Sequence, residues 1–518
     1  MSRLTWPGRL GPSLGPGLLM FAVSLISAGR PVLSWDEIAT AEVAGRTPEQ
    51  IVRMMPVIDG VFGPYYLLEH FWTSIAGATE LELRLPSMVA MAGAVALTAE
   101  LGRRLFGPPA GAAAGLLLCL VPATSQYAAE ARPYAFACFF AVLSLLSLHV
   151  AVDRLRVRRW IAYAMAVLFL GLSHVIALTT LAAHAVVMLR HRDRRTVLAW
   201  SLAAGLPLLA LAPILWLGVR ERHAQLSWVP PLRPHSLWDF PGEVVGSMAG
   251  GWLLLGLAAP ALCRPLRHRG EVVALGAAPI AVVAAVSVLV TPYWVPRYLL
   301  IVLAPLALLA AAALFPSPAS PAATPATGPT AGPGVGPEPR RWRAATLRMA
   351  TVLALRMATV LALLACAVYP AERAVRGPNA KSGSDYRAAA AVIRSRQQPG
   401  DAIAYAARSR AMRSGLGYYL RHDPQRPSDV LLSRSAADVG NLTAEEFPPT
   451  AARLRTTSRL WFLVAGAHED PLTVRPELRP VVLAEFRPAR IWFLPHETLA
   501  LFVRVGATTP PAPVPPTR

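Results

Sequence analysis

Long apolar runs, separated by short polar segments, dominate the first 370 residues of the chain. Each run has roughly 17 to 25 residues, the length that an α-helix needs to cross a bilayer. The pattern therefore predicts about eleven membrane-spanning helices. The runs start near Leu14, Leu85, Ala110, Pro133, Trp160, His174, Val197, Ser247, Glu271, Tyr298 and Met349.

The arginines between the runs predict the orientation of the chain. If Arg3 and Arg9 are cytoplasmic, the alternating loops place about nineteen arginines inside and about nine outside. An odd number of crossings then puts the segment after Tyr369 outside. The first run, 14–28, also has the layout of a signal peptide, whose cleavage would leave the later crossings unchanged.

The chain beyond residue 315 differs from the predicted membrane core, 1–315. A Pro, Ala, Gly and Thr-rich segment, 316–346, indicates a flexible cytoplasmic linker. The last membrane helix is expected at 347–370, where an octapeptide occurs twice in tandem. A small extracytoplasmic α/β domain is expected at 380–508, followed by a disordered tail at 509–518.

The predicted α/β domain has alternating helical and strand patterns. Helices are expected at 385–396 and before His422, with a short strand between them. Further strands are expected at 460–464, 481–486, 490–494 and 499–503. The domain has no glycine-rich phosphate loop and no catalytic constellation.

The composition excludes an ordinary soluble protein. The 518 residues are 54% hydrophobic and 15% charged, with a mean hydropathy of +0.43. A net charge of +20 is also found in nucleic-acid-binding proteins. Here, however, the arginines lie in short clusters between apolar runs, which indicates membrane-topology signals and no nucleic-acid partner. Lys381 is the single lysine. The four cysteines lie in apolar segments and imply no disulfide or zinc framework.

The longest outer loop, 34–84, contains the first candidate chemistry. Asp36 and Glu37 stand at the outer interface, where partial desolvation could raise a carboxyl pKa toward that of a general base. The alternative is that Ser34 or Asp36 caps a surface helix beginning at Ile38.

Other outer loops add candidates on the same membrane face. Arg132 and Arg297 are suited to bind a phosphate or carboxylate, or alternatively to anchor the interface, for Arg132 through a pair with Glu130. Tyr134, Tyr298 and His174 could contact substrate or form an interface belt. The convergence of these residues on one face is the argument for a site.

Six motifs together identify a family. They are SWDE after the first helix, DGVFGPYYLLEHFW and ELRLPS in the long loop, RRLFGPPAG, QYAAEARPYA, and PRYLL. In this order they resemble the GT-C glycosyltransferases of the protein O-mannosyltransferase-like group, family 39, and its bacterial relatives. The resemblance covers roughly the first 315 residues.

The resemblance implies a function and a site. It implies transfer of a sugar, mannose or a related hexose or pentose, from a polyprenyl phosphate to an extracytoplasmic envelope acceptor by a single inverting displacement. Asp36 and Glu37 are the implied catalytic acidic pair, and Glu130 the second acidic group. The other implied site residues bind substrate or phosphate, or are further loop candidates: Arg132, Tyr134, Arg297, Tyr298, His174, Arg84, Asp59 and His70.

The resemblance leaves several features open. A divalent cation is possible, because relatives differ in their use of one. The acceptor is an envelope glycan, a glycolipid or a protein, and the location is the plasma membrane of a bacterium. The competing functions are a lipid-linked sugar transporter or flippase, and a non-catalytic envelope anchor.

Overall fold

The computed structural model describes residues 11–26, 28–191, 193–266, 268–315, 339–381, 383–407 and 409–506. These residues form two compact units. The helical unit contains those within Met1–Ala28, Gly60–Tyr65 and Arg84–Arg376, and the sheet unit contains those within Gly29–Asp59, Tyr66–Leu83 and Gly377–Arg518. Most of the predicted linker, 316–338, and the predicted tail, 509–518, lie outside the described residues.

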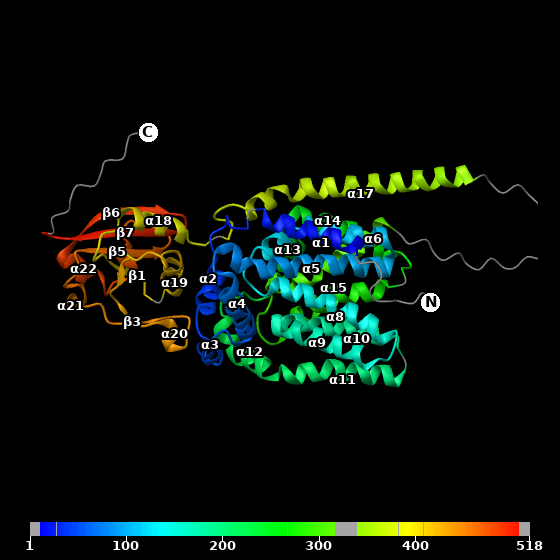
Figure 1. The fold of residues 1–518 in the computed structure, drawn as a ribbon, viewed down its shortest axis with the longest axis horizontal. Helices are drawn as coiled ribbons and strands as arrows, with labels where there is room; N and C mark the ends of the chain where they lie inside the picture. Colours follow the sequence, from blue (N-terminus) through cyan, green and yellow to red (C-terminus); the bar gives the residue numbers. More distant parts are fainter. Residues whose placement is uncertain are drawn as a thin grey trace, which may run out of the picture. The chain divides into compact units, whose positions relative to one another are not determined.

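The helical unit consists of α-helices and three 3₁₀ segments (Figure 1). Its elements are α1 (Gly11–Leu25), η1 (Gly60–Phe62), α5 (Glu80–Phe106, from Arg84 on), α6 (Pro108–Cys119), α7 (Pro122–Ala128), α8 (Tyr134–Val152), α9 (Val157–Ser173), η2 (Val175–Thr179), α10 (Thr180–Met188), α11 (Arg194–Ala210), α12 (Ala212–Gln225), α13 (Pro234–Val245), α14 (Met248–Cys263), α15 (Arg269–Leu289), η3 (Pro296–Val302), α16 (Leu303–Leu314) and α17 (Pro339–Val375). The core includes aliphatic side chains of α5, α6, α8, α9, α14, α15 and α16. Helix α17 packs beside α14 and begins at Pro339, inside the predicted linker.

Each of the eleven predicted runs corresponds to a helical element or a bent helix pair. Five helices in the described part of the chain are long and apolar enough to cross a membrane, or up to eight if each bent pair is one span. The count falls below eleven because α1, α9 and the η2–α10 stretch are shorter than a full span.

Among the residues that the structure describes, three helix pairs bend sharply at short breaks. The turns are 68° between α6 and α7, 56° between α11 and α12, and 94° between α13 and α14. At the sharpest bend, Gly246 ends α13 with a φ of +79°, a conformation that favours glycine. The Ser247 side chain then accepts a hydrogen bond from the Gly250 N–H and starts α14.

The sheet unit combines strands with short helices. Its elements are α2 (Trp35–Ala44), α3 (Pro48–Met54), most of α4 (Gly63–Ala76), α18 (Tyr386–Arg396), β1 (Ala402–Tyr405), α19 (Arg410–Tyr419), β2 (Ser428–Asp429), β3 (Leu432–Arg434), α20 (Ala436–Val439), β4 (Glu445–Glu446), α21 (Ala451–Leu454), β5 (Arg459–Ala465), η4 (Pro471–Val474), α22 (Arg479–Glu485), β6 (Phe486–Leu494) and β7 (Glu497–Arg504). The predicted mixed α/β character of the C-terminal part is confirmed.

The main sheet has the strand order β2-β1-β5-β7-β6. Strands β1, β2 and β5 are parallel, whereas β7 pairs antiparallel with both β5 and β6. Strand β5 is buried over six of its seven residues because it lies at the centre of the sheet. Buried side chains on one face include Phe462, Phe486 and Phe502.

One predicted strand, at 481–486, is wrong. The chain forms helix α22 there, with Pro480 in the first turn, where its missing N–H leaves no hydrogen bond unmade. Val482 is buried in the core of the sheet unit. A short apolar run fits both the two-residue period of a strand and the 3.6-residue period of a helix. Here the burial of one helical face selects the helix.

Candidate functional site

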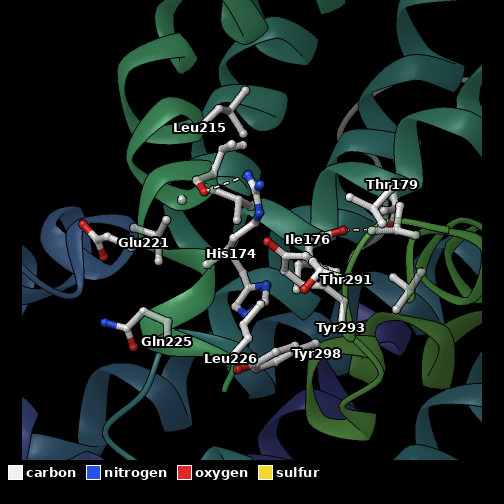
Figure 2. A pocket seen from close by; sticks show the side chains of 18 of the residues that line it. His174, Ile176, Thr179, Leu215, Glu221, Gln225, Leu226, Thr291, Tyr293 and Tyr298 are labelled. Carbon is white, nitrogen blue, oxygen red and sulfur yellow. Dashed lines mark hydrogen bonds between the residues drawn. The ribbon is translucent and has the colours of Figure 1, made fainter. Parts of the chain in front are cut away.

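A cavity of about 480 Å³ lies in the helical unit, lined by α12, the C-terminal part of α15, and residues of η1, η2 and η3 (Figure 2). Most of the wall is aliphatic, with valine, leucine and isoleucine side chains from every one of these elements except η3. The polar side chains in the lining are His174, Thr179, Glu221, Arg222, Gln225, Thr291, Tyr293 and Tyr298. The cavity therefore combines an apolar wall with several polar side chains.

Three residues predicted from the sequence form one aromatic group, and two of them, His174 and Tyr298, line this cavity. Tyr134 begins α8, His174 joins α9 to η2, and Tyr298 lies in η3. The ring centroids are 5.7 Å apart for Tyr134 and His174, 5.0 Å for His174 and Tyr298, and 6.3 Å for the two tyrosines. In Figure 2 the His174 and Tyr298 rings lie next to each other at the cavity.

Two predicted arginines flank the aromatic group. The Arg132 guanidinium carbon is 4.2 Å from the centroid of the Phe62 ring, and Phe62 is 6.4 Å from the His174 ring. The Arg297 guanidinium lies 5.8 Å from the Tyr298 centroid. Stacking on a ring fixes a guanidinium while its N–H groups point along its own plane, where an oxyanion can bind.

Glu130 lies in the tight turn before α8. Its side chain is buried, and its carbonyl oxygen accepts a hydrogen bond of 2.8 Å from the Arg132 N–H. The turn therefore orients the backbone that carries Arg132.

Two charged residues of the cavity, Glu221 and Arg222, were not predicted from the sequence. Both lie near the end of α12. A Glu221 carboxylate oxygen accepts a hydrogen bond of 3.1 Å from the Gly60 N–H, which fixes the start of η1 against α12. The charged sequence RERHAQ at the end of an apolar run was the available signal.

The adjacent carboxylates Asp36 and Glu37 lie in the first turn of α2, in the sheet unit. Ser34 caps this helix: its hydroxyl accepts from the Glu37 N–H at 3.2 Å, and its own N–H donates to the Glu37 carboxylate at 2.9 Å. Glu37 is buried and also pairs with Lys381, whereas Asp36 is half-buried. The capping role considered for this segment therefore falls to Ser34 and Glu37, and the helix begins at Trp35.

Three other candidates have local partners. Asp59, with a φ of +56°, accepts a hydrogen bond of 2.7 Å from the Tyr66 hydroxyl. His70 Nδ1 donates to the Ala44 carbonyl oxygen at 2.9 Å. Arg84, in the helical unit, is buried and donates to the Ala28 carbonyl oxygen at 2.5 Å. These contacts give each of the three a structural role.

No group of three or more His, Cys, Asp or Glu side chains among the described residues is arranged to bind a metal ion. A divalent cation therefore stays a prediction from the resemblance alone.

Comparisons with known proteins bear on the fold. Residues 62–217, less than a third of the chain, match the family model described as dolichyl-phosphate-mannose-protein mannosyltransferase. No curated protein sequence matches the chain. The chain is similar to the crystal structure of ArnT from Cupriavidus metallidurans bound to undecaprenyl phosphate, at 13% identity and a TM-score of 0.56, over 95% of this chain and 98% of that one. The apo state of ArnT gives 15% identity and a TM-score of 0.54, over 94% and 97%.

The chain has the GT-C fold. The GT-C resemblance predicted from the six motifs is confirmed, together with the all-helical multi-pass membrane part and the small strand-containing C-terminal part. Because nearly the whole length of both chains aligns, the GT-C fold extends to the described residues beyond 338, which none of the six motifs covers.

Proposed function

We propose that this protein is a membrane glycosyltransferase that moves a sugar from a polyprenyl phosphate to an extracytoplasmic acceptor. The observation that carries the proposal is the cavity, which joins an aliphatic wall to arginine, glutamate, histidine and tyrosine side chains. A polyprenyl-phosphate sugar has the same division into a hydrocarbon chain, an anionic phosphate and a sugar ring. The relative ArnT has been crystallised with undecaprenyl phosphate, which supports a lipid of this class.

The polar residues in and near the cavity would bind different parts of the donor. Arg222 is the arginine in the lining and would pair with the donor phosphate. Arg132 and Arg297, stacked beside the aromatic group, would stabilise the charge that develops on the leaving polyprenyl phosphate. Tyr134, His174 and Tyr298 would contact the sugar ring.

Asp36 is the proposed general base of a single inverting displacement. It would accept the proton of the acceptor hydroxyl as the oxygen attacks the anomeric carbon and the polyprenyl phosphate departs. Such assistance is worth roughly 10²- to 10⁴-fold in rate. The Glu37 carboxylate accepts hydrogen bonds from the Ser34 N–H and from Lys381, and these contacts lower its strength as a base.

The finer assignment follows the sequence resemblance. The enzyme would be a polyprenyl-phosphate-sugar-dependent transferase that uses mannose or a related sugar, with a bacterial envelope glycan, glycolipid or protein as acceptor. The reaction would take place at the outer face of the plasma membrane, with the N-terminus inside and the C-terminal α/β part outside.

A lipid-linked sugar transporter is the second candidate, and the three bent helix pairs favour it. Interrupted helices are a feature of transporters whose substrate site lies between helix halves. The two candidates differ in outcome, because a transporter moves the intact lipid-linked sugar and leaves the glycosyl phosphate bond unbroken.

Transfer of radiolabelled sugar from a panel of polyprenyl-phosphate sugars to envelope acceptors tests the proposal. Membranes containing the wild-type protein, Asp36→Asn or the control Glu49→Gln are compared. Glu49 is an exposed carboxylate of α3 in the same loop. We expect transfer from one donor, lost in Asp36→Asn and kept in Glu49→Gln. Labelled lipid-linked sugar that crosses vesicle membranes intact, without transfer from any donor, would instead establish a transporter.

A further inference from the structure

Lys381 is the single lysine of a chain that has 50 basic lysine and arginine residues, and its side chain is largely covered although the residue as a whole is half-buried. Its Nζ lies 2.6 Å from a carboxylate oxygen of Glu37, with the two side chains 6% and 0% exposed. A buried ion pair is costly to desolvate and survives only with good geometry and further hydrogen bonds. Here the same carboxylate oxygen also accepts from the Ser34 N–H, so the pair is joined to the capping box of α2.

The segment before α2 is held by the residues that follow the last membrane helix. The Val32 N–H donates to the Pro378 carbonyl oxygen at 2.9 Å. The Leu33 N–H donates to the Tyr419 hydroxyl at 3.2 Å, and that hydroxyl donates to Glu80 at 2.7 Å. The pKa of Tyr419 is raised, mainly by burial and to a smaller extent by its hydrogen bond to the Glu80 carboxylate, so the hydroxyl keeps the proton that it donates.

Arg387 adds two contacts to the same segment. Its guanidinium donates to the carbonyl oxygens of Gly29 and Arg30, at 3.3 and 3.1 Å, and pairs with Glu80 at 2.6 Å. Residues of the C-terminal part therefore bind the backbone of 29–33 at four points and the side chain of Glu37 at a fifth. Such a set of contacts fixes the direction in which α2 starts.

We propose that Lys381 is a positioning residue for Asp36, and that the C-terminal part of the chain acts as a brace for the helix that carries this carboxylate. The Lys381 ammonium holds the Glu37 carboxylate, which closes the capping box with Ser34 and so fixes the first turn of α2. Asp36 lies in that turn. The catalytic consequence rests on the proposed function, whereas the brace itself does not.

The chemistry of the Lys381–Glu37 pair explains why this position has a lysine, whereas the other Lys and Arg positions of the chain are all arginine. An ammonium is a compact point charge on a flexible stem, whereas a guanidinium is a planar group with five N–H donors. A guanidinium at this position would have to place five N–H donors where the ammonium places three. We therefore expect Lys381→Arg to behave like a loss of the pair, although it keeps the charge.

The first experiment measures the pair directly, in the full chain reconstituted in lipid nanodiscs. Because Lys381 is the single side-chain amine, its acylation by an amine-reactive reagent can be followed at one peptide by mass spectrometry. We expect Glu37→Gln to raise the rate of acylation at least tenfold. The control Glu445→Gln, which breaks the exposed Arg434–Glu445 pair, leaves the rate unchanged. An unchanged rate in Glu37→Gln overturns the pairing.

The second experiment tests the brace and its consequence with Lys381→Gln and Lys381→Arg. Hydrogen exchange of the peptide that contains residues 31–38 should speed up in both variants, while exchange in β5 stays as in the wild type. With a transferable donor, kcat should fall at least tenfold and the KM for donor should stay within about twofold. Unchanged kcat, or equal loss of exchange protection throughout the chain, overturns the positioning role. If the wild-type protein transfers no sugar, the proposed function fails, and acylation and exchange still decide the brace.

Discussion

Glu497 begins strand β7 with a carboxyl group that is fully buried. Neither of its oxygens has a hydrogen-bond partner within the described part of the chain. Burial, and then the nearby Asp385 carboxylate, raises the pKa of Glu497 from 4.5 to about 8. We therefore expect the folded protein to hold Glu497 protonated at neutral pH.

The direction of the pH dependence follows from linkage. The unfolded chain releases the proton near pH 4.5 and the folded chain near pH 8, so the contribution of Glu497 to stability is full below 4.5 and is lost as the pH rises through 8. At about 1.4 kcal/mol per pH unit, this interval sets an upper limit of roughly 5 kcal/mol on the loss. Glu497→Gln keeps the shape of the protonated side chain and cannot ionise.

The assay is thermal unfolding of the full chain in detergent between pH 5 and pH 9, with hydrogen exchange in β5 and β7 reporting on the sheet unit. Near pH 5 we expect Glu497→Gln and the wild type to unfold at similar temperatures. The variant should become the more stable by several kcal/mol as the pH reaches 8, and the difference should then level off. A difference that does not depend on pH, or a variant that is less stable at pH 8, would show that Glu497 is not protonated in the folded protein.

Two further predictions concern the helical unit. Gly251→Ala places a Cβ 2.0 Å from the Pro241 carbonyl oxygen and should destabilise the α13–α14 bend by about 3 kcal/mol or more. The control Gly256→Ala, on the same helix, meets nothing within 4 Å and should leave the melting temperature unchanged or slightly raised. Arg222→Met should raise the KM for donor about tenfold and leave folding intact, because it removes the arginine from the cavity lining; an unchanged KM would place the phosphate elsewhere.

The apolar runs predicted where the helices lie but not how they bend. A membrane-spanning helix needs an apolar stretch of about 20 residues, and such a stretch can be identified from the sequence. A bend depends on a local conformation such as that of Gly246 and on close backbone packing such as that of Gly251 with Pro241. Neither glycine can be distinguished in the sequence from an ordinary glycine in an apolar run, so the runs did not predict the three bends on which the range of five to eight spans depends.

The candidate site was predictable where residues stand near helix ends on one face. Tyr134, His174 and Tyr298 follow that rule and meet within 6.3 Å of one another. Glu221 and Arg222 lie near the C-terminal end of helix α12. Charged residues at such a position are usually exposed to water, so the sequence did not indicate that these two line a cavity. Lys381 is 344 positions away from its partner Glu37, and no local pattern links residues so far apart.

The central claim is that Asp36 acts in the chemical step of sugar transfer from a polyprenyl phosphate. The most direct test measures donor binding and single-turnover release of polyprenyl phosphate on the same nanodisc preparations of wild-type protein and Asp36→Asn. We expect an equal Kd for the donor and a release rate at least 10²-fold slower in the variant. Equal release rates in the two proteins would contradict it.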